Sequence, residues 1–135
     1  MRALSIAALL ALIAACSSTQ VSMSEAIEVA PVRYQLFRER MPGRVAVMIT
    51  RDNGFIGREC PTSIAVNGHL AVSLRPGEKA TLHIPAGEVI FGADAGMCGG
   101  GLSELGVALL SGHTTYLRIS ADQSGAMRLE KTVAR

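Results

Sequence analysis

SIAVNGHLAVSLRPGEKATLHIPAGE, residues 63–88, is the stretch that decides the fold of this chain. Apolar residues alternate with small or polar residues on both sides of Asn67 and Gly68. An Asn-Gly pair between two such runs predicts a β-hairpin with a type I′ turn. The following RPGE has the composition of a type II turn, so a third strand should follow at once. The residues that we expect to face the core are Ile64, Val66, Leu70, Val72, Leu74, Ala80, Leu82 and Ile84.

The same β pattern extends in both directions along the chain. The further apolar runs are residues 45–49, 89–93, 105–110, 115–119 and 127–129. No segment requires a helix of ordinary length, and short strands at this spacing are typical of a sandwich or small barrel. We therefore expect an all-β domain at residues 43–135, with seven or eight short antiparallel strands. Phe55 and Phe91 should be its largest core side chains.

The first 16 residues, MRALSIAALLALIAAC, predict a secretory leader. Arg2 precedes an apolar run that is shorter than the roughly 20 residues of a membrane span. The small residues before Cys16 resemble the lipobox of bacterial lipoproteins. That resemblance implies a signal peptide at residues 1–15, cleavage before Cys16, and acyl chains such as palmitate on Cys16. An ordinary signal cut after Ala15 and a retained membrane anchor are the alternatives.

Lipidation of Cys16 would also determine where the protein resides. Two or more acyl chains anchor a protein stably, so the membrane itself would be a partner. In the lipoproteins that this sequence resembles, Ser17 is compatible with transfer to the outer membrane, and we expect the periplasmic face of a Gram-negative envelope. Residues 16–42 show no sustained period and are predicted to be a flexible tether carrying the lipid.

Cys60 and Cys98 are the two cysteines that remain after Cys16. The periplasm is oxidising, so we predict that they form a disulfide. Metal binding by these cysteines with histidines is the alternative, but no C-x-x-C or H-x-x-x-H spacing supports it, and we expect no metal or cofactor. His69 and His83 are expected on the outward faces of adjacent strands, and His113 in a turn.

The charges of the chain are nearly balanced and scattered. It has 13 Lys and Arg residues, one of them Arg2, and 11 Asp and Glu residues. Without a basic block there is no electrostatic reason to bind nucleic acid, and we expect no such partner.

Two loops are candidate binding sites, and each has a plainer interpretation. A turn with a charged pair beside an aromatic residue could recognise a partner, or it could be an ordinary turn with a packed Phe. A run of glycines could expose amides to an anion, or it could be a turn that follows a disulfide. These candidate residues are Arg51, Asp52, Asn53, Phe55, Gly99, Gly100 and Gly101. No G-x-S-x-G elbow or carboxylate pair indicates an enzyme, and we expect no catalytic residues.

Several stretches together resemble a group of small proteobacterial outer-membrane lipoproteins with an uncharacterised β domain. They are the lipobox, GRVAVMITRDNGFIGREC, the hairpin segment and CGGG. The resemblance implies an immunoglobulin-like or transthyretin-like sandwich, and it implies that the pair Cys60 and Cys98 belongs to the pattern of this group. It carries no catalytic residues.

These observations favour a non-enzymatic role in the cell envelope. We expect a protein-interaction or structural accessory module, in which a partner protein of the envelope could extend an edge strand. The alternative is a module that binds cell wall, a glycan or a small ligand. Sugar sites usually use aromatic faces, and the chain has no Trp and only Tyr34 and Tyr116, which disfavours this alternative.

Overall fold

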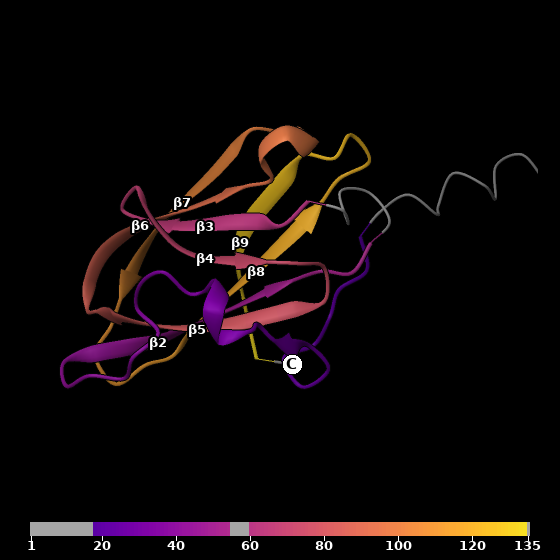
Figure 1. Cartoon of the computed structure of the whole chain (residues 1–135). Coiled ribbons are helices and arrows are strands. Elements are labelled where there is room, and N and C mark those ends of the chain that lie inside the picture. Colours follow the sequence, from indigo (N-terminus) through magenta and orange to yellow (C-terminus); the bar gives the residue numbers. More distant parts are fainter. Residues whose placement is uncertain (1–17, 55–59, 135) are drawn as a thin grey trace, which may run out of the picture.

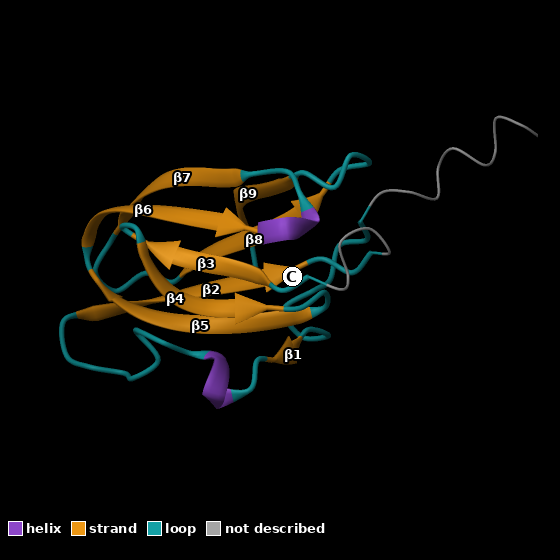
Figure 2. Ribbon diagram, turned by 45° about the horizontal axis from the view of Figure 1, so that its top comes forward, coloured by secondary structure: helices purple, strands orange, loops and turns teal. Residues whose placement is uncertain are grey.

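The computed structural model describes residues 18–54 and 60–134, and their strands form two sheets (Figures 1 and 2). The five-stranded sheet has the order β1 (Ile27–Glu28), β5 (Glu78–Pro85), β2 (Arg44–Arg51), β8 (Thr115–Ala121) and β9 (Met127–Thr132). The four-stranded sheet has the order β4 (His69–Leu74), β3 (Thr62–Val66), β6 (Gly87–Asp94) and β7 (Leu102–Leu109). The described residues contain two short 3-10 helices, η2 (Pro31–Arg33) and η3 (Gly96–Cys98), and no α-helix. The predicted all-β class is confirmed.

The strand pairing is mixed, so the prediction of purely antiparallel strands is wrong. β1 pairs with β5 in parallel, and β2 pairs with β8 in parallel. The described residues also form nine strands, where we expected seven or eight. Alternation of apolar residues indicates which face of a strand is buried, but it does not indicate the direction of the neighbouring strand.

The hairpin and the turn after it have the predicted geometry. Asn67 and Gly68 have φ values of 48° and 81°, as a type I′ turn requires. In the next turn Gly77 has a φ of 78°, and the amide of Glu78 donates to the carbonyl of Arg75 at 3.1 Å. This second turn carries the chain from β4 in one sheet to β5 in the other.

The core lies between the two sheets and is built mainly of aliphatic side chains. Phe91 is fully buried, as predicted, whereas Phe55 lies outside the described residues. The predicted inward face of β5 is confirmed by the burial of Ala80, Leu82 and Ile84.

β4 departs from simple alternation because the pairing of β3 with β4 contains a bulge. Ile64 pairs with Val72 but Ala65 pairs with Leu70, so Ala71 is an extra residue on β4. A bulge changes the face to which the following side chains point. Ala71 is therefore buried and Leu70 is 46% exposed, and the expectation that Leu70 faces the core is wrong.

Residues 18–37 form a strap along one side of the molecule, which we call the N-terminal strap. Its amides donate to both sheets: that of Val29 to Lys79 on β5, and that of Gln35 to Ala71 on β4. Val21, Ala26 and Val29 are buried in it. The prediction of a flexible tether is therefore wrong for the described part of this segment. Single residues of the strap contact one sheet and then the other. Its buried residues therefore do not recur at a regular spacing in the sequence.

An ion pair fastens the strap to β5. Both terminal nitrogens of Arg33 donate to the carboxylate of Glu78, one of them at 2.7 Å. The same carboxylate accepts the amide of Arg75 at 2.7 Å. Burial acts to raise the pKa of Glu78, but the hydrogen bonds from Arg33 and Arg75 and their charges outweigh it and hold this pKa below its ordinary value.

Arg33→Ala is expected to lower the free energy of unfolding by about 1–2 kcal/mol at pH 7. A carboxylate whose pKa is lowered by folding stabilises the fold above its unfolded pKa, and this contribution is lost as the pH falls through the folded pKa. The difference between Arg33→Ala and the unaltered chain should therefore shrink at pH 3 in urea unfolding. The matched control is Arg38→Ala, because the contacts of Arg38 are weak: the exposed Glu39 lies at 4.0 Å, and the centroid of the Tyr34 ring lies 6.0 Å from its guanidinium carbon. An equal effect at both pH values would contradict this role of the Glu78 charge.

Candidate functional site

The side of the molecule opposite the N-terminal strap is bordered by β7 and β9. Each of these strands has a strand neighbour on one side only. The two edges come together near η3, where the amide of Leu129 donates to the hydroxyl of Ser103 at 3.2 Å. The strap covers the edge of β4 and part of the edge of β5, so among the described strands, apart from the two-residue β1, the unpaired edges lie on this opposite side.

The hydrogen bonds of β6 show which groups of β7 point away from the sheet. The amide and carbonyl of Ile90 both bond to Asn67, on the β3 side of β6. Backbone direction alternates along a strand, so the neighbours of Ile90 bond to β7 and pair there with Leu105 and Val107. The residues of β7 whose amides and carbonyls point outward are therefore Leu102, Glu104, Gly106 and Ala108, and all four are exposed.

β7 lacks the features that usually protect an edge strand from pairing. Such edges are normally short, bulged, or guarded by Lys, Pro or other charged residues. β7 is LSELGVAL, eight residues in unbroken register with β6, with Glu104 as its one charged residue. The other edge, β9, is MRLEKT and carries charge at three of its six positions. β7 is therefore the edge that is open to a further strand.

The interior next to β7 is incompletely closed. Leu105 faces inward but is only partly buried, while Val107 and Leu109 behind it are buried. A strand added to β7 would place alternate side chains over Leu105 and complete this side of the core. A strand added at this edge would therefore gain both backbone hydrogen bonds with β7 and an apolar contact with Leu105.

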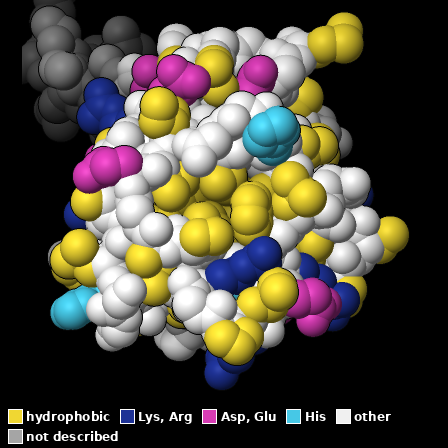
Figure 3. Space-filling model, turned by 90° about the vertical axis from the view of Figure 1, so that its left-hand side faces the viewer, with side chains coloured by type: hydrophobic (Ala, Val, Ile, Leu, Met, Phe, Trp, Pro, Cys, Tyr) yellow, Lys and Arg dark blue, Asp and Glu magenta, His cyan; other side chains and the backbone are white. Residues whose placement is uncertain are grey.

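The C-terminal end of β7 leads to an apolar end of the molecule. Figure 3 shows this end, where hydrophobic side chains fill a hollow beside a cluster of Lys and Arg. Three apolar residues next to strand ends are exposed: Met41 before β2 at 49%, Leu70 near the start of β4 at 46%, and Leu110 just after β7 at 60%. Exposed apolar patches of this kind mark interaction surfaces.

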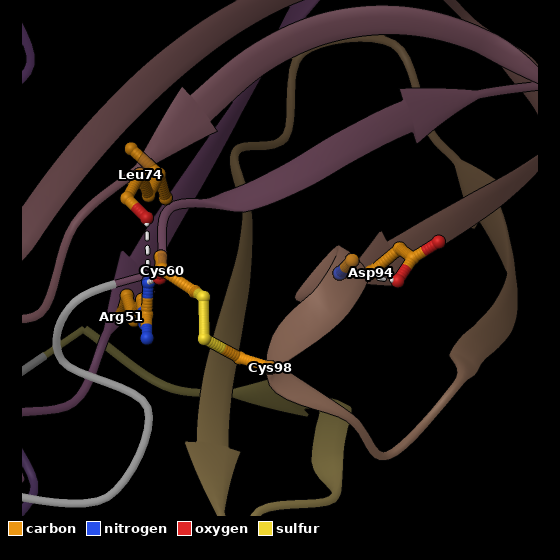
Figure 4. Close-up of a disulfide and its surroundings, with 6 residues drawn as sticks. Arg51, Cys60, Leu74, Asp94 and Cys98 are labelled. Atoms are coloured by element: carbon orange, nitrogen blue, oxygen red, sulfur yellow. Dashed lines mark hydrogen bonds between the residues drawn. A yellow bond between two sulfur atoms is a disulfide. The ribbon is translucent and has the colours of Figure 1, made fainter.

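The structure joins Cys60 and Cys98 in the predicted disulfide, with Cα atoms 6.0 Å apart (Figure 4). Cys60 lies just before β3, and Cys98 ends η3, so the bond ties the start of β3 to the connection between β6 and β7. Arg51 lies beside it and donates to the carbonyls of Cys60 at 2.6 Å and Leu74 at 2.8 Å. Burial lowers the pKa of Arg51 to about 10.

Arg51 and Asp52, which were candidates for a recognition loop, are buried parts of the fold. They are 3% and 4% exposed. Asp52 accepts bonds from two nitrogens of Arg118, the shortest at 2.6 Å, and from the hydroxyl of Ser18 at 3.2 Å. These side chains link β2, β8 and the strap, and do not form an exposed surface.

The remaining candidate residues are distributed as follows. Asn53 is exposed and pairs with Thr19 of the strap. Gly99, Gly100 and Gly101 form an exposed turn with positive φ values, and a Cβ on Gly100 would lie 2.5 Å from the Cα of Ala126. The glycine at 100 therefore permits a close approach of two chain segments. The predicted site residues Cys16 and Phe55 lie outside the described residues.

The histidines are dispersed. His69 begins β4 in the four-stranded sheet and His83 lies on β5 in the five-stranded sheet, so the expectation that they are neighbours across one sheet is wrong. The two histidines lie in different sheets because the turn at Gly77 takes the chain from one sheet to the other. Within residues 18–54 and 60–134, no group of three metal-ligating side chains comes together. A search of the same residues finds no helix that is long and apolar enough to span a bilayer.

A scan against models of protein families finds no match, and a search of curated proteins finds none that is significantly similar to this chain. The geometry of the sheet edge is therefore the basis for a functional proposal.

Proposed function

We propose that this protein is an outer-membrane lipoprotein, anchored by acyl chains on Cys16, whose β domain binds a partner protein of the envelope without catalysing a reaction. Anchoring is supported by the lipobox-like residues before Cys16. The resemblance to small lipoproteins with an immunoglobulin-like or transthyretin-like domain is part of the same proposal.

The single observation that carries the binding role is the free edge of β7. Its four residues with outward amides and carbonyls are exposed, the strand contains no Lys or Pro, and it stays in register with β6 over eight residues. An extended segment of a partner would pair with these groups and continue the four-stranded sheet, as in other cases of β-augmentation. Backbone bonds would supply affinity, and side chains at alternate positions would supply selectivity.

Site-specific photo-crosslinking in cells tests this proposal on the full-length chain. A photoreactive residue in place of Glu104, which is outward on β7, should yield a defined crosslinked species. The same residue in place of Arg128, exposed on β9, should not yield it. Ala108→Pro should reduce the β7 crosslink at least about fivefold, because Pro removes an outward donor and leaves the bonds to β6 intact.

Ala108→Ser is the matched control, because it keeps the backbone amide and should keep the crosslink. A β spectrum for both variants by circular dichroism would show that they fold. A crosslink that is insensitive to Ala108→Pro, or equally strong from position 128, would contradict partner binding at β7.

A further inference from the structure

The outward face of the four-stranded sheet carries charge of a single sign. Its inward side chains point to the core, and the outward residues alternate with them along each strand. The outward residues are Ser63, Ala65, Leu70, Ser73, Glu88, Ile90, Gly92, Asp94, Leu102, Glu104, Gly106 and Ala108. Glu88, Asp94 and Glu104 are acidic, and none of the twelve is Lys, Arg or His.

The three carboxylates lie on β6 and β7, the two strands nearest the free edge. In the register of these strands Glu104 is opposite Gly92, Glu88 is opposite Ala108, and Asp94 is opposite Leu102. Glu88 and Glu104 are exposed, and in the described part of the chain none of the three forms an ion pair. The carboxylates of Glu88 and Glu104 are therefore available to charges on a neighbouring strand, whereas the partly buried Asp94 already accepts the amide of Gly96 at 2.7 Å.

This acidity is local to one face. The outward face of the five-stranded sheet instead carries charges of both signs: Arg44, Lys79, Arg118 and Arg128, together with Glu28 beside Lys79 and Glu130 beside Arg118. A face with acidic charges alone is thus a property of the four-stranded sheet, although the charges of the whole chain nearly balance.

We propose that the segment that pairs with β7 is cationic, with Lys or Arg at the positions that join the acidic face and aliphatic residues at the positions between them. This inference rests on the proposed binding at β7. Opposite charges on neighbouring strands stabilise their pairing. The aliphatic positions would cover Leu105, and the cationic ones would lie beside Glu104 and within reach of Glu88.

A second copy of this chain fits the edge less well. Pairing of β7 with β7 of another molecule would join two acidic faces, each with Glu88, Asp94 and Glu104, into one continuous sheet face. Like charges on facing strands destabilise their pairing. Charge therefore favours a different protein with a basic extended segment.

Two fluorescent peptides distinguish these possibilities with the full-length chain purified in detergent. Thr-Val-Lys-Val-Lys-Val-Lys-Val-Thr alternates aliphatic and cationic residues, and Thr-Val-Glu-Val-Glu-Val-Glu-Val-Thr reverses the charge. By fluorescence anisotropy in low salt, the Lys peptide should bind at least about tenfold more tightly than the Glu peptide. This ratio should fall towards one in 1 M NaCl, where the screening length is about 3 Å.

Charge reversal on β7 sharpens the test. Glu104→Lys should weaken binding of the Lys peptide by about tenfold and strengthen binding of the Glu peptide. Glu39→Lys changes the net charge equally but lies in the loop after the strap, with its side chain 81% exposed, and should change neither affinity. Ala108→Pro should weaken binding of both peptides, whereas Ala108→Ser should leave both affinities unchanged.

The outcomes separate the partner chemistry from the binding site. Equal binding of both peptides, abolished by Ala108→Pro, would overturn the cationic partner and leave the β7 edge as the binding site. Binding of neither peptide at millimolar concentration would overturn both proposals. Dimerisation of the unaltered chain that Ala108→Pro abolishes would assign the edge to a second copy and overturn the cationic partner.

Discussion

Replacing both Cys60 and Cys98 by Ser is expected to lower the free energy of unfolding by about 4 kcal/mol. The bond joins cysteines that are 38 positions apart, and the chain-entropy account of disulfides attributes this effect to the freedom that the unfolded chain regains. A domain of this size has a total stability on the order of 5–15 kcal/mol, so the loss is a large share of the total.

Urea unfolding of the double Ser variant and of the unaltered chain measures the difference. The unaltered chain in dithiothreitol should unfold at the same urea concentration as the variant, and its oxidised form should be two hydrogens lighter by intact mass. Loss of the bond should also increase amide exchange at the start of β7 more than in the Asn67 turn, because Cys98 lies just before β7. A stability change below about 1 kcal/mol would refute the structural role of the bond.

Arg118→Met is expected to destabilise the fold by about 3–5 kcal/mol. The side chain of Asp52 is 1% exposed and accepts bonds from Arg118 at 2.6, 2.9 and 3.1 Å. Removing the guanidinium leaves a buried carboxylate with the hydroxyl of Ser18 as its remaining described side-chain donor. An uncompensated buried charge is among the costlier defects that one substitution can create.

A double-mutant cycle tests whether the cost comes from the orphaned charge. Asp52→Leu together with Arg118→Met should recover much of the lost stability, because no charge then remains buried. Glu130→Gln is the control: Glu130 also contacts Arg118, at 3.2 Å, but its side chain is 39% exposed, and the effect should stay below about 1 kcal/mol. Additive losses in the double variant would contradict this explanation.

Local features of the fold were predictable from the sequence. The Asn67 and Gly68 turn, the turn at Gly77 and the inward face of β5 each follow from residue types within a few positions of one another. The disulfide could also be predicted, since it depended only on compartment and on the number of cysteines.

Features that depend on distant contacts were not predictable in this way. The burial of Asp52 depends on Arg118, 66 positions later, and the parallel pairing of β2 with β8 spans a similar distance. The bulge at Ala71 could not be predicted from the sequence, because Leu70 and Ala71 are both apolar and the pattern does not show which of them faces the core. The open edge was also hidden: residues 105–110 were expected to form a strand, but only the order of strands shows that β7 lies at an edge.

The attachment of Ser18 has a consequence for how the proposed lipoprotein would stand on a bilayer. Ser18 bonds to Asp52 and to the amide of Ala121, at the end of the sandwich that also holds the disulfide. Cys16 is two positions earlier, and two residues extend at most about 7 Å. With acyl chains on Cys16, the domain would lie against the lipid headgroups, and its distance from the bilayer would vary little. β7 would extend over about 26 Å away from the bilayer. Its partner would therefore bind close to the membrane surface and not at the end of a long flexible tether.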